Sequence, residues 1–391
     1  MKISWISNAP WAASGYGNQT KLFTPRLKAL GHDVSIIALW GLEGGLLNWN
    51  GIPVYPKGIQ QWSNDVAAAH AVHWNAKILI SLFDIWPMNP DQLQQHGVRW
   101  VPWFPIDMDP IPPVVARNAS KAFDRIVFSK FGQRMTENAG LTCHYVPHGV
   151  DTKTLYPMEQ AEARKIIGMP QDKFIVGMVA ANKGNPSRKA LCEHMSAFAR
   201  LHEKHPDTLL YIHTSAGQNG EYGGINLPEY AKFLGLDKSV AYADQYMYHM
   251  GYPDEYMRAL YSSFDVHALA SMGEGFGIPI VEAQACGCPV IVGDWTANSV
   301  LCFSGWKVDK KDSTPYYTPI GSYQFTPHIG PLAELMELAY RMKGNEDYRK
   351  RARDGALKYD ADKVAEKYWK PVLELIEEKL ADKPDMKLVK F

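Results

Sequence analysis

The sequence lacks several features that would place a protein in a class at once. It has 5 cysteines in 391 residues, and they follow no regular spacing. Cys286 and Cys288 are separated by a single residue, which is closer than the ligands of a common zinc knuckle, and they have no companion pair. We therefore expect reduced, buried cysteines rather than a disulfide framework or a metal site.

Charge of one sign and long apolar runs are also missing. Lys plus Arg number 41 and Asp plus Glu number 41, so the formal net charge is zero. This balance argues against a general attraction to nucleic acid or an anionic membrane, although a local patch is compatible with it. No run of about 18 apolar residues occurs, and the first residues lack the apolar stretch and cleavage site of a signal peptide. We expect a cytoplasmic protein without a membrane span.

Short apolar runs alternate with amphipathic helical stretches along the whole chain. Near-continuous apolar strands separated by helices predict parallel sheets covered on both faces, and two successive sets predict two doubly wound α/β domains of the Rossmann type. The expected strands are 2–7, 34–39, 78–83, 100–105, 125–128, 143–146, 174–179, 209–214, 240–243, 266–269 and 289–292. The expected helices include 18–30, 65–74, 131–139, 190–202, 253–263, 279–286, 331–342 and 361–380.

We predict three segments from this alternation. Residues 1–165 form an N-terminal, acceptor-side domain, and residues 166–358 form a C-terminal donor domain. Residues 359–391 form a closing helix that crosses back to the N-terminal domain, because its apolar face needs a surface to cover. The run 147–151, which includes His148, reads as a hinge turn between the domains.

The stretch 271–292 is the most informative part of the chain. It reads as the end of a strand, a glycine-rich loop, a short helix and a new strand. Pro279 suits the first helical turn, where its missing N–H would be unpaired in any case. Gly287 suits the residue just past the helix end. The pattern therefore predicts a loop whose shape is set by a helix with well-defined ends.

That loop has the chemistry of a nucleotide-sugar site. Gly275, Phe276 and Gly277 can turn backbone N–H groups toward a ligand, and with the helix N-terminus they form a site for a diphosphate. Glu274 lies at its mouth and Glu282 lies on the helix. Carboxylates do not hold phosphate, so their natural partners are hydroxyls, one on a sugar and one on a ribose.

Two glutamates eight apart around Gly-Phe-Gly-x-Pro resemble the paired-glutamate signature of glycosyltransferase family 4. The resemblance implies the GT-B architecture, in which two Rossmann-like domains face a central cleft and a C-terminal helix packs back on the N-terminal domain. It also implies a hexosyltransferase-type enzyme that retains the anomeric configuration. The co-substrate would be a nucleotide diphosphate sugar, most commonly a UDP-sugar, with no required cofactor or metal. By matching position, Glu274 would contact the donor sugar and Glu282 the ribose.

The same resemblance assigns cations to the donor diphosphate. Lys189 matches the family lysine in the polar loop that follows strand 174–179, and Arg188 beside it can supply a second cation. The usual arginine directly after the strand is replaced, with Asn182 as the nearest substitute. A solvated basic helix start is the alternative interpretation, although cations at a helix N-terminus are unfavourable without an anion.

In the first half, Gly15 and Gly17 match the family's glycine loop over the donor phosphates. A simple turn at Ser14-Gly15 is an alternative. A dinucleotide-cofactor loop does not fit, because Thr20 stands where Gly-x-Gly-x-x-Gly needs its last glycine. Asp107 stands where the family often has a histidine, and it could bind a sugar hydroxyl or the acceptor. Asp107-x-Asp109 also resembles the metal-binding pair of the other transferase fold, which the strand rhythm argues against.

One further loop departs from the family pattern. After strand 289–292 many relatives have Gly-Gly followed by Glu; Thr296 and Ala297 stand in that loop here, and the contact that they make cannot be read from the sequence. No carboxylate is placed as a nucleophile, which fits a front-face route in which the donor's own phosphate oxygen takes the acceptor proton.

Several alternatives remain at this point. The chain could be a nucleotide-sugar epimerase, a sugar phosphorylase or other GT-B enzyme, a non-catalytic nucleotide-sugar-binding protein or, least convincingly, a nicotinamide oxidoreductase. The acceptor could be a polysaccharide, a modified DNA base, a protein or a small molecule, and the neutral charge makes DNA less attractive. Aromatic residues of the first half are candidate stacking platforms for it: Trp11, Trp40, Trp49, Trp62, Trp86 and Trp103.

Overall fold

The structure is a computed structural model that describes residues 1–217 and 223–382. The chain divides into two compact units. Unit 1 comprises Met1–Gly149, Pro319–Ser322 and the chain from Tyr359 onward, and unit 2 comprises Val150–Thr318 and Tyr323–Lys358. The predicted return of the C-terminal segment to the N-terminal domain is therefore seen in unit 1. The first boundary lies at Gly149, earlier than the predicted 165.

Unit 1 contains a sheet of strand order β3-β4-β2-β1-β5-β6-β7-β8. All neighbouring strands are parallel except β3 and β4. The strands are β1 Lys2–Ser7, β2 Asp33–Ala38, β3 Leu47–Trp49, β4 Ile52–Tyr55, β5 Ile78–Leu82, β6 Trp100–Phe104, β7 Ile126–Val127 and β8 His144–Tyr145. The helices are α1 Gly15–Ala29, α2 Asn64–Trp74, α3 Pro90–Gln95, α4 Pro113–Ser120 and α5 Lys130–Asn138.

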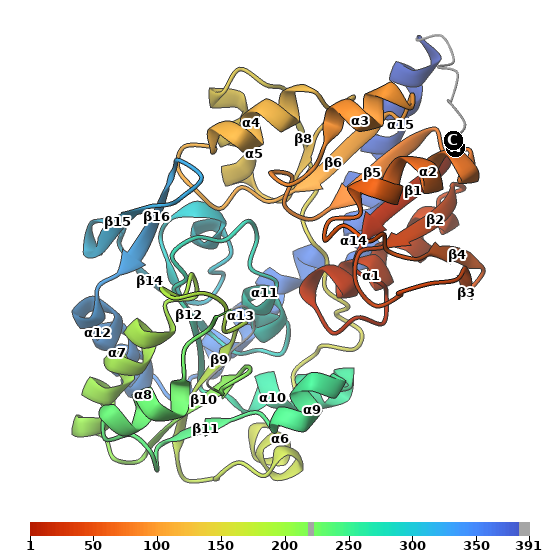
Figure 1. The fold of residues 1–391 in the computed structure, drawn as a ribbon. Helices are drawn as coiled ribbons and strands as arrows, with labels where there is room; N and C mark the ends of the chain where they lie inside the picture. Colours follow the sequence, from red (N-terminus) through yellow and green to blue (C-terminus); the bar gives the residue numbers. More distant parts are fainter. Residues whose placement is uncertain (218–222, 383–391) are drawn as a thin grey trace. The chain divides into compact units, whose positions relative to one another are not determined.

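Both faces of this sheet are covered (Figure 1). Successive strand residues point to opposite faces, so Ile6 joins the core beneath α2 to α5 while its neighbour Trp5 points to the other face. There the Trp5 ring packs against the Trp103 ring, with 5.7 Å between the ring centroids. Trp103 also packs against Phe23. Trp5 and Trp103 are fully buried.

The C-terminal segment completes that second face. It consists of α14 Ala361–Val364, a π-helical turn Ala365–Trp369 and α15 Lys370–Ala381. Trp369 is fully buried and lies 5.7 Å from Trp5 and 4.9 Å from Trp103 between ring centroids. An ion pair between Arg26 and Asp362, at 2.8 Å, fastens the start of the segment to α1. The predicted packing of this helix on the N-terminal domain is thus confirmed.

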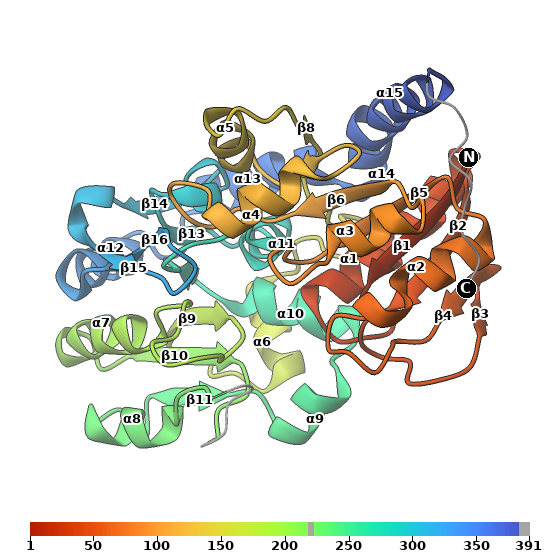
Figure 2. The same cartoon turned by 45° about the horizontal axis from the view of Figure 1, so that its top comes forward.

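Unit 2 contains a parallel sheet of order β11-β10-β9-β12-β13-β14. Helix α7 packs against α12, α10 against α6 and α11 against α13, and in Figure 2 α7 and α6 lie on opposite sides of the strands. The strands are β9 Phe174–Val179, β10 Thr208–His213, β11 Val240–Tyr242, β12 Val266–Leu269, β13 Val290–Gly293 and β14 Gly305–Val308. The helices are α6 Gln160–Ile167, α7 Leu191–Lys204, α8 Leu227–Phe233, α9 Gln245–Met250, α10 Asp254–Ser263, α11 Ile278–Ala285, α12 Ile329–Arg341 and α13 Glu346–Ala356.

The earlier domain boundary has a clear physical cause. Helix α6 packs against α10 of unit 2, and Arg164 on α6 makes an ion pair with Asp265 at 2.7 Å. The Arg164 guanidinium also donates to the carbonyl oxygen of Ser263. Both side chains of the Arg164–Asp265 ion pair are nearly buried, so the second unit holds this segment firmly. The sequence prediction had placed the segment in the first unit.

Two antiparallel pairs were not predicted. Strands β3 and β4 form a hairpin whose turn is Asn50-Gly51, both with positive φ. Strands β15 Ser313–Tyr317 and β16 Tyr323–Pro327 form a second hairpin after β14. The Phe325 amide of β16 donates to the carbonyl of Met272, so this hairpin supports the glycine-rich loop. None of the described helices is long and apolar enough to cross a membrane.

Candidate functional site

The glycine-rich loop is held by the helix that follows it. Helix α11 carries Pro279 in its first turn, as predicted, and Gly277 precedes it with φ 108. At the other end of the helix Gly287 has φ 79. The Gly287 amide donates to the Gln284 carbonyl, and the Cys288 amide donates to the Ala283 carbonyl. This pair of hydrogen bonds is a Schellman motif, which ends the helix abruptly. The predicted helix ends are confirmed.

Glu274 lies between the two predicted cations. Its Oε1 atom is paired with Lys189 Nζ, and its Oε2 atom lies 3.2 Å from the Arg188 guanidinium. The Glu274 side chain is only 7% exposed and that of Lys189 14%. Burial raises the pKa of Glu274, but the positive charges of Lys189 and Arg188 together lower it by more, so that the pKa is about 2. The structure therefore brings all three residues together, with the glutamate ionised.

A second loop, after β13, fixes the backbone of Glu274. The Glu274 amide donates to Thr296 Oγ1 at 3.1 Å, and the Ala297 amide donates to the Glu274 carbonyl at 3.3 Å. Thr296 has φ 52, in the left-handed region where glycine is favoured. Thr296 thus has a glycine-like backbone conformation, and its hydroxyl accepts a hydrogen bond from the Glu274 amide.

Glu282 is tied to the core of unit 2. The Tyr261 hydroxyl donates to Glu282 Oε2 at 2.8 Å, and Tyr261 is fully buried. Burial is the main cause that raises the pKa of Glu282, to about 7, with the nearby Asp254 charge adding to it. The tyrosine therefore orients the carboxylate, and binding a hydroxyl donor at the second oxygen would stabilise its charged form. Sequence analysis did not identify Tyr261.

His194 of α7 joins the two loops of the site. Its Nε2 accepts from the Ala270 amide at 3.0 Å and its Nδ1 contacts the Ala190 carbonyl at 2.7 Å. Ala190 follows Lys189, and Ala270 directly follows β12, the strand that leads to the glycine-rich loop. Burial lowers the pKa of His194 to about 4, so the ring is neutral and its proton sits on Nδ1. Nothing in the residue spacing pointed to this contact.

Asn182 does not take over the role of the arginine that the family usually has directly after strand 174–179. It is 1% exposed, and its amide nitrogen donates to the carbonyls of Ser215 and Ile225 while its oxygen accepts from the Ile225 amide. The side chain therefore pins the loop after β10 and is fully engaged in doing so. We correct the interpretation of Asn182 as a diphosphate contact.

Several buried polar atoms near the ends of the strands have no hydrogen-bond partner within the described residues. They include both side-chain amide atoms of Asn298, the hydroxyl oxygens of Ser187 and Thr214 and Nδ1 of His213. Asn298 Oδ1 lies 3.5 Å from where a Cβ on Gly277 would stand. Buried polar groups normally have a partner, so these atoms fit a site that is completed by a polar ligand.

The residues predicted in the first half lie in unit 1. Gly15 begins α1, and Ser14 caps the helix by accepting from the Gly17 amide at 3.0 Å. A Cβ on Gly17 would lie 2.3 Å from the Ala12 carbonyl oxygen, so packing alone requires glycine there. Asp107 follows β6 and is partly exposed. Its predicted contact with sugar or acceptor stays a prediction.

Two residues of unit 1 that sequence analysis singled out, Trp103 as a stacking platform and His148 in the hinge run, are buried. Trp103 is fully buried and its indole N–H donates to the Val146 carbonyl, so it is a core residue and no stacking platform. His148 is 2% exposed and its Nδ1 lies 3.0 Å from Gln19 Oε1. Gln19 also accepts from the Gly149 amide, so this run is anchored to α1.

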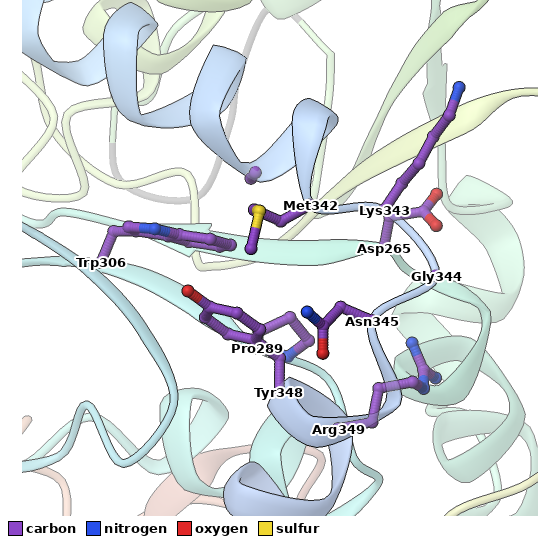
Figure 3. A pocket seen from close by; sticks show the side chains of 10 residues that line it. Asp265, Pro289, Trp306, Met342, Lys343, Gly344, Asn345, Tyr348 and Arg349 are labelled. Carbon is purple, nitrogen blue, oxygen red and sulfur yellow. The ribbon is translucent and has the colours of Figure 1, made fainter.

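A separate pocket lies at the amino end of the unit 2 strands (Figure 3). Trp306 and Tyr348 stack there with ring centroids 5.1 Å apart, and Asp265 and Pro289, which precede β12 and β13, complete the wall. Glu274 and Thr296 follow the same two strands, at the opposite edge. Within residues 1–217 and 223–382, no three His, Cys, Asp or Glu side chains are grouped as metal ligands would be.

The glycine-rich loop and the cation loop fall within one matched segment. Residues 159–301 match the family model described as "Glycosyl transferases group 1". This segment belongs to the group 1 glycosyl transferases. D-inositol 3-phosphate glycosyltransferase of Corynebacterium urealyticum is 28% identical over 45% of this chain and 41% of its own length. The same enzyme of Actinosynnema mirum is 29% identical over 37% of this chain and 34% of its own length. The chain thus covers less than half of these relatives.

Solved structures extend the likeness beyond the group 1 segment. Sucrose-phosphate synthase from Thermosynechococcus elongatus has a TM-score of 0.74 and 16% identity, and the match covers 98% of this chain and 100% of that one. Anabaena Alr3699/HepE in complex with UDP-glucose has a TM-score of 0.68 and 16% identity, over 97% and 100% of the two chains. The group 1 segment is therefore part of a GT-B fold of two Rossmann-like domains, as predicted.

Proposed function

We propose that this chain is a retaining, metal-independent glycosyltransferase of the hexosyltransferase type. Its donor would be a nucleoside diphosphate sugar, and we take a UDP-sugar as the first candidate, since a solved structure of the same fold is a complex with UDP-glucose. The group 1 match over the donor loops supports the activity. The observation that carries the proposal is the cluster of Glu274, Lys189 and Arg188 at the carboxyl edge of the unit 2 sheet.

In this proposal the cluster exchanges partners when the donor binds. The donor diphosphate replaces the Glu274 carboxylate as the partner of Lys189 and Arg188, since both are anions. The Gly275, Phe276 and Gly277 amides and the α11 N-terminus add further positive potential. Before the donor binds, Glu274 has a pKa of about 2 and is ionised near neutral pH, and an ionised carboxylate accepts hydrogen bonds, which suits sugar hydroxyls. Glu282 accepts a ribose hydroxyl while Tyr261 holds its other oxygen.

Transfer then breaks the bond between the anomeric carbon and the diphosphate oxygen and forms a bond to the acceptor oxygen on the same face. The acceptor hydroxyl's proton passes to the departing phosphate oxygen. Lys189 and Arg188 stabilise the charge that grows on the diphosphate, the kind of preorganised electrostatic contribution that commonly supplies several kcal/mol. No protein nucleophile is needed, and the products are the glycosylated acceptor and the nucleoside diphosphate.

A thermal-shift screen in EDTA tests the donor site. Wild type, Glu282→Ala and the surface control Glu203→Ala are heated with UDP, GDP, ADP and their common hexose conjugates. Ligands that bind only the native state raise the midpoint. We expect one nucleotide family to raise the Tm of wild type and Glu203→Ala, and Glu282→Ala to lose the shift. A folded wild type that no nucleotide shifts would contradict the proposal.

Product analysis separates transfer from its rivals. The nucleotide that gives the shift is incubated as its sugar conjugate with and without pooled acceptors. Slow release of nucleoside diphosphate, faster with acceptor, supports transfer. Conversion of the donor to its epimer with the nucleotide still attached indicates an epimerase. Binding with neither outcome leaves a non-catalytic nucleotide-sugar-binding protein.

A further inference from the structure

Asn298 differs from the other buried polar side chains of the molecule. It lies in the short 3-10 helix Thr296–Val300 that follows β13, and it is fully buried. Neither its Nδ2 nor its Oδ1 atom has a hydrogen-bond partner within the part of the chain that the structure describes. Among residues 1–217 and 223–382 it is the one side chain with two such atoms. Because unpaired buried polar groups lower stability, the fold by itself does not account for an asparagine at this position.

The turn that carries Asn298 supports the glycine-rich loop. The Glu274 amide donates to Thr296 Oγ1, and the Ala297 amide donates to the Glu274 carbonyl. Asn298 Oδ1 lies 3.5 Å from the point where a Cβ on Gly277 would stand. Asn298 is therefore adjacent to the loop that we assign to the donor, and its amide oxygen lies on the side of Gly277.

The chemistry of the carboxamide limits what can pair with it. Nδ2 carries two N–H donors, whereas Oδ1 only accepts. The oxygens of an ionised diphosphate also accept, so a phosphate satisfies Nδ2 and leaves Oδ1 unpaired. A ligand that satisfies both atoms must present a hydrogen-bond donor and an acceptor side by side. Exchanging the two amide atoms by a half-turn leaves this requirement unchanged.

The sugar of a nucleotide sugar meets this requirement. Two adjacent hydroxyls of a hexose offer one donor and one acceptor, and the acetamido group of an N-acetylhexosamine offers an N–H and a carbonyl. We propose that Asn298 binds such a pair on the donor sugar, Nδ2 donating to one group and Oδ1 accepting from the other. The proposal rests on the proposed glycosyltransferase function. It adds a residue that selects the sugar, while Lys189 and Arg188 hold the diphosphate.

Binding at Asn298 requires a small movement of the loop. The end of the Ile280 side chain fills the space beside Asn298 in the free protein, because its Cδ1 atom lies 2.8 Å from the same Cβ position of Gly277. Changes of side-chain rotamer are common when ligands bind. The proposed partner exchange of Glu274 moves the same loop, so the sugar reaches Asn298 as the Glu274 cluster opens.

Calorimetric titration in EDTA tests the sugar contact. UDP, UDP-glucose and UDP-N-acetylglucosamine are titrated into wild type and Asn298→Ala, or the guanosine or adenosine counterparts if those give the thermal shift. The quantity compared is the Kd of the free nucleotide divided by the Kd of each conjugate. We expect this ratio to fall about tenfold in the variant for at least one conjugate, because two neutral hydrogen bonds are lost. The conjugate affected tells whether the pair is two hydroxyls or an acetamido group.

Thermal unfolding without ligand separates this role from a structural one. The matched control is Asn118→Ala in unit 1, which removes a buried asparagine whose Nδ2 donates to the Ile85 carbonyl at 2.8 Å and to the Met88 carbonyl at 3.2 Å. That control leaves carbonyls unpaired, so its Tm should fall while the Kd ratio stays that of wild type. Asn298→Ala leaves no partner unpaired, so its Tm should fall by less.

Two results would overturn the inference. One is a Kd ratio that Asn298→Ala leaves unchanged for every conjugate, in which case the donor site stands without this contact. The other is a loss of Tm in Asn298→Ala as large as that in Asn118→Ala, which would give Asn298 a structural partner such as a buried water. If the wild type binds neither a nucleotide nor a conjugate, the proposed function itself fails.

Discussion

The Nε2 atom of His194 accepts a hydrogen bond from the Ala270 amide at 3.0 Å, while Nδ1 of the same ring bonds the Ala190 carbonyl at 2.7 Å. One buried imidazole thus sets the distance between the loop of Lys189 and the loop of Glu274. The role of His194 is positioning, since the predicted ligand contacts are made by Lys189 and Glu274 and not by the histidine ring.

The substitution His194→Ala is expected to weaken both the fold and the donor site. It leaves the Ala270 amide and the Ala190 carbonyl buried without partners, and each such loss costs about 1–3 kcal/mol. The glutamine side chain carries both an NH2 donor group and an acceptor oxygen, so His194→Gln should recover part of the loss. The checks are Tm and the nucleotide-induced shift. If the nucleotide shift of His194→Ala equals that of wild type, the positioning role is wrong and the histidine only fills the core.

The acid sensitivity of unit 2 should follow from the same group. Burial lowers the pKa of His194 to about 4 and that of His267 to about 3, against 6.5 in an unfolded chain. A histidine kept neutral in the fold adds stability that is complete above pH 6.5 and is lost as the pH falls toward 4. We expect Tm to fall over that window, and the fall to be smaller in His194→Gln. An equal fall in both proteins would assign the effect to other groups.

The strand pattern was predictable because parallel strands buried on both faces are short apolar runs. Strands 2–7, 174–179 and 266–269 agree with β1, β9 and β12 in both ends, and the others agree within one or two residues. The hairpins were missed for different reasons. β15 contains Pro315 and two exposed tyrosines, so it does not read as a buried apolar strand. The Asn50-Gly51 turn between β3 and β4 is a hairpin signal that sequence analysis overlooked.

The candidate site shows what local spacing can and cannot reveal. Glu274 and Glu282 are recognisable because loop and helix place them within eight residues of each other. Lys189 could be joined to Glu274 only through the resemblance to a family, since 85 residues separate them. Tyr261 and His194 act through tertiary contacts that no motif encodes. Segment 150–165 was assigned to the wrong unit because the Arg164–Asp265 ion pair is equally invisible in the sequence.

Lys189→Met is expected to lower stability and abolish transfer. It leaves the nearly buried Glu274 carboxylate with Arg188 alone, and breaking a buried ion pair typically costs about 3–5 kcal/mol. Adding Glu274→Gln removes the uncompensated charge. The double variant should therefore recover Tm while transfer stays lost, because the diphosphate still lacks its cation. Denaturant unfolding and donor turnover measure the two properties separately. Recovery of turnover in the double variant would show that Lys189 serves the fold and not the donor.

Gly17→Ala should destabilise unit 1 whether or not a donor is bound. The new Cβ would lie 2.3 Å from the Ala12 carbonyl oxygen, so the 8–14 loop must shift, at a cost of about 1–3 kcal/mol. The matched control is Gly44→Ala, where a Cβ meets nothing within 4 Å and no loss of Tm is expected. Equal Tm values for the two variants would mean that the loop yields without strain.

Glu282→Gln separates stability from binding through pH. The pKa of Glu282 is raised to about 7 in the fold against about 4.3 in an unfolded chain. A carboxyl with a raised pKa favours the fold below the unfolded pKa and loses that contribution as the pH rises through 7. Glutamine cannot ionise, so Glu282→Gln should match wild type at about pH 4, below the unfolded pKa, and exceed its Tm at about pH 8. The gain should be at least several degrees, since each pKa unit is worth about 1.4 kcal/mol and 1 kcal/mol corresponds to about 2–4 °C in a domain of this size. The same variant should bind nucleotide less well at pH 8, because a neutral amide accepts a ribose hydroxyl more weakly than a carboxylate does. A variant that is less stable than wild type at pH 8 would show that the Tyr261 hydroxyl requires the charged carboxylate, and the raised pKa would then be wrong.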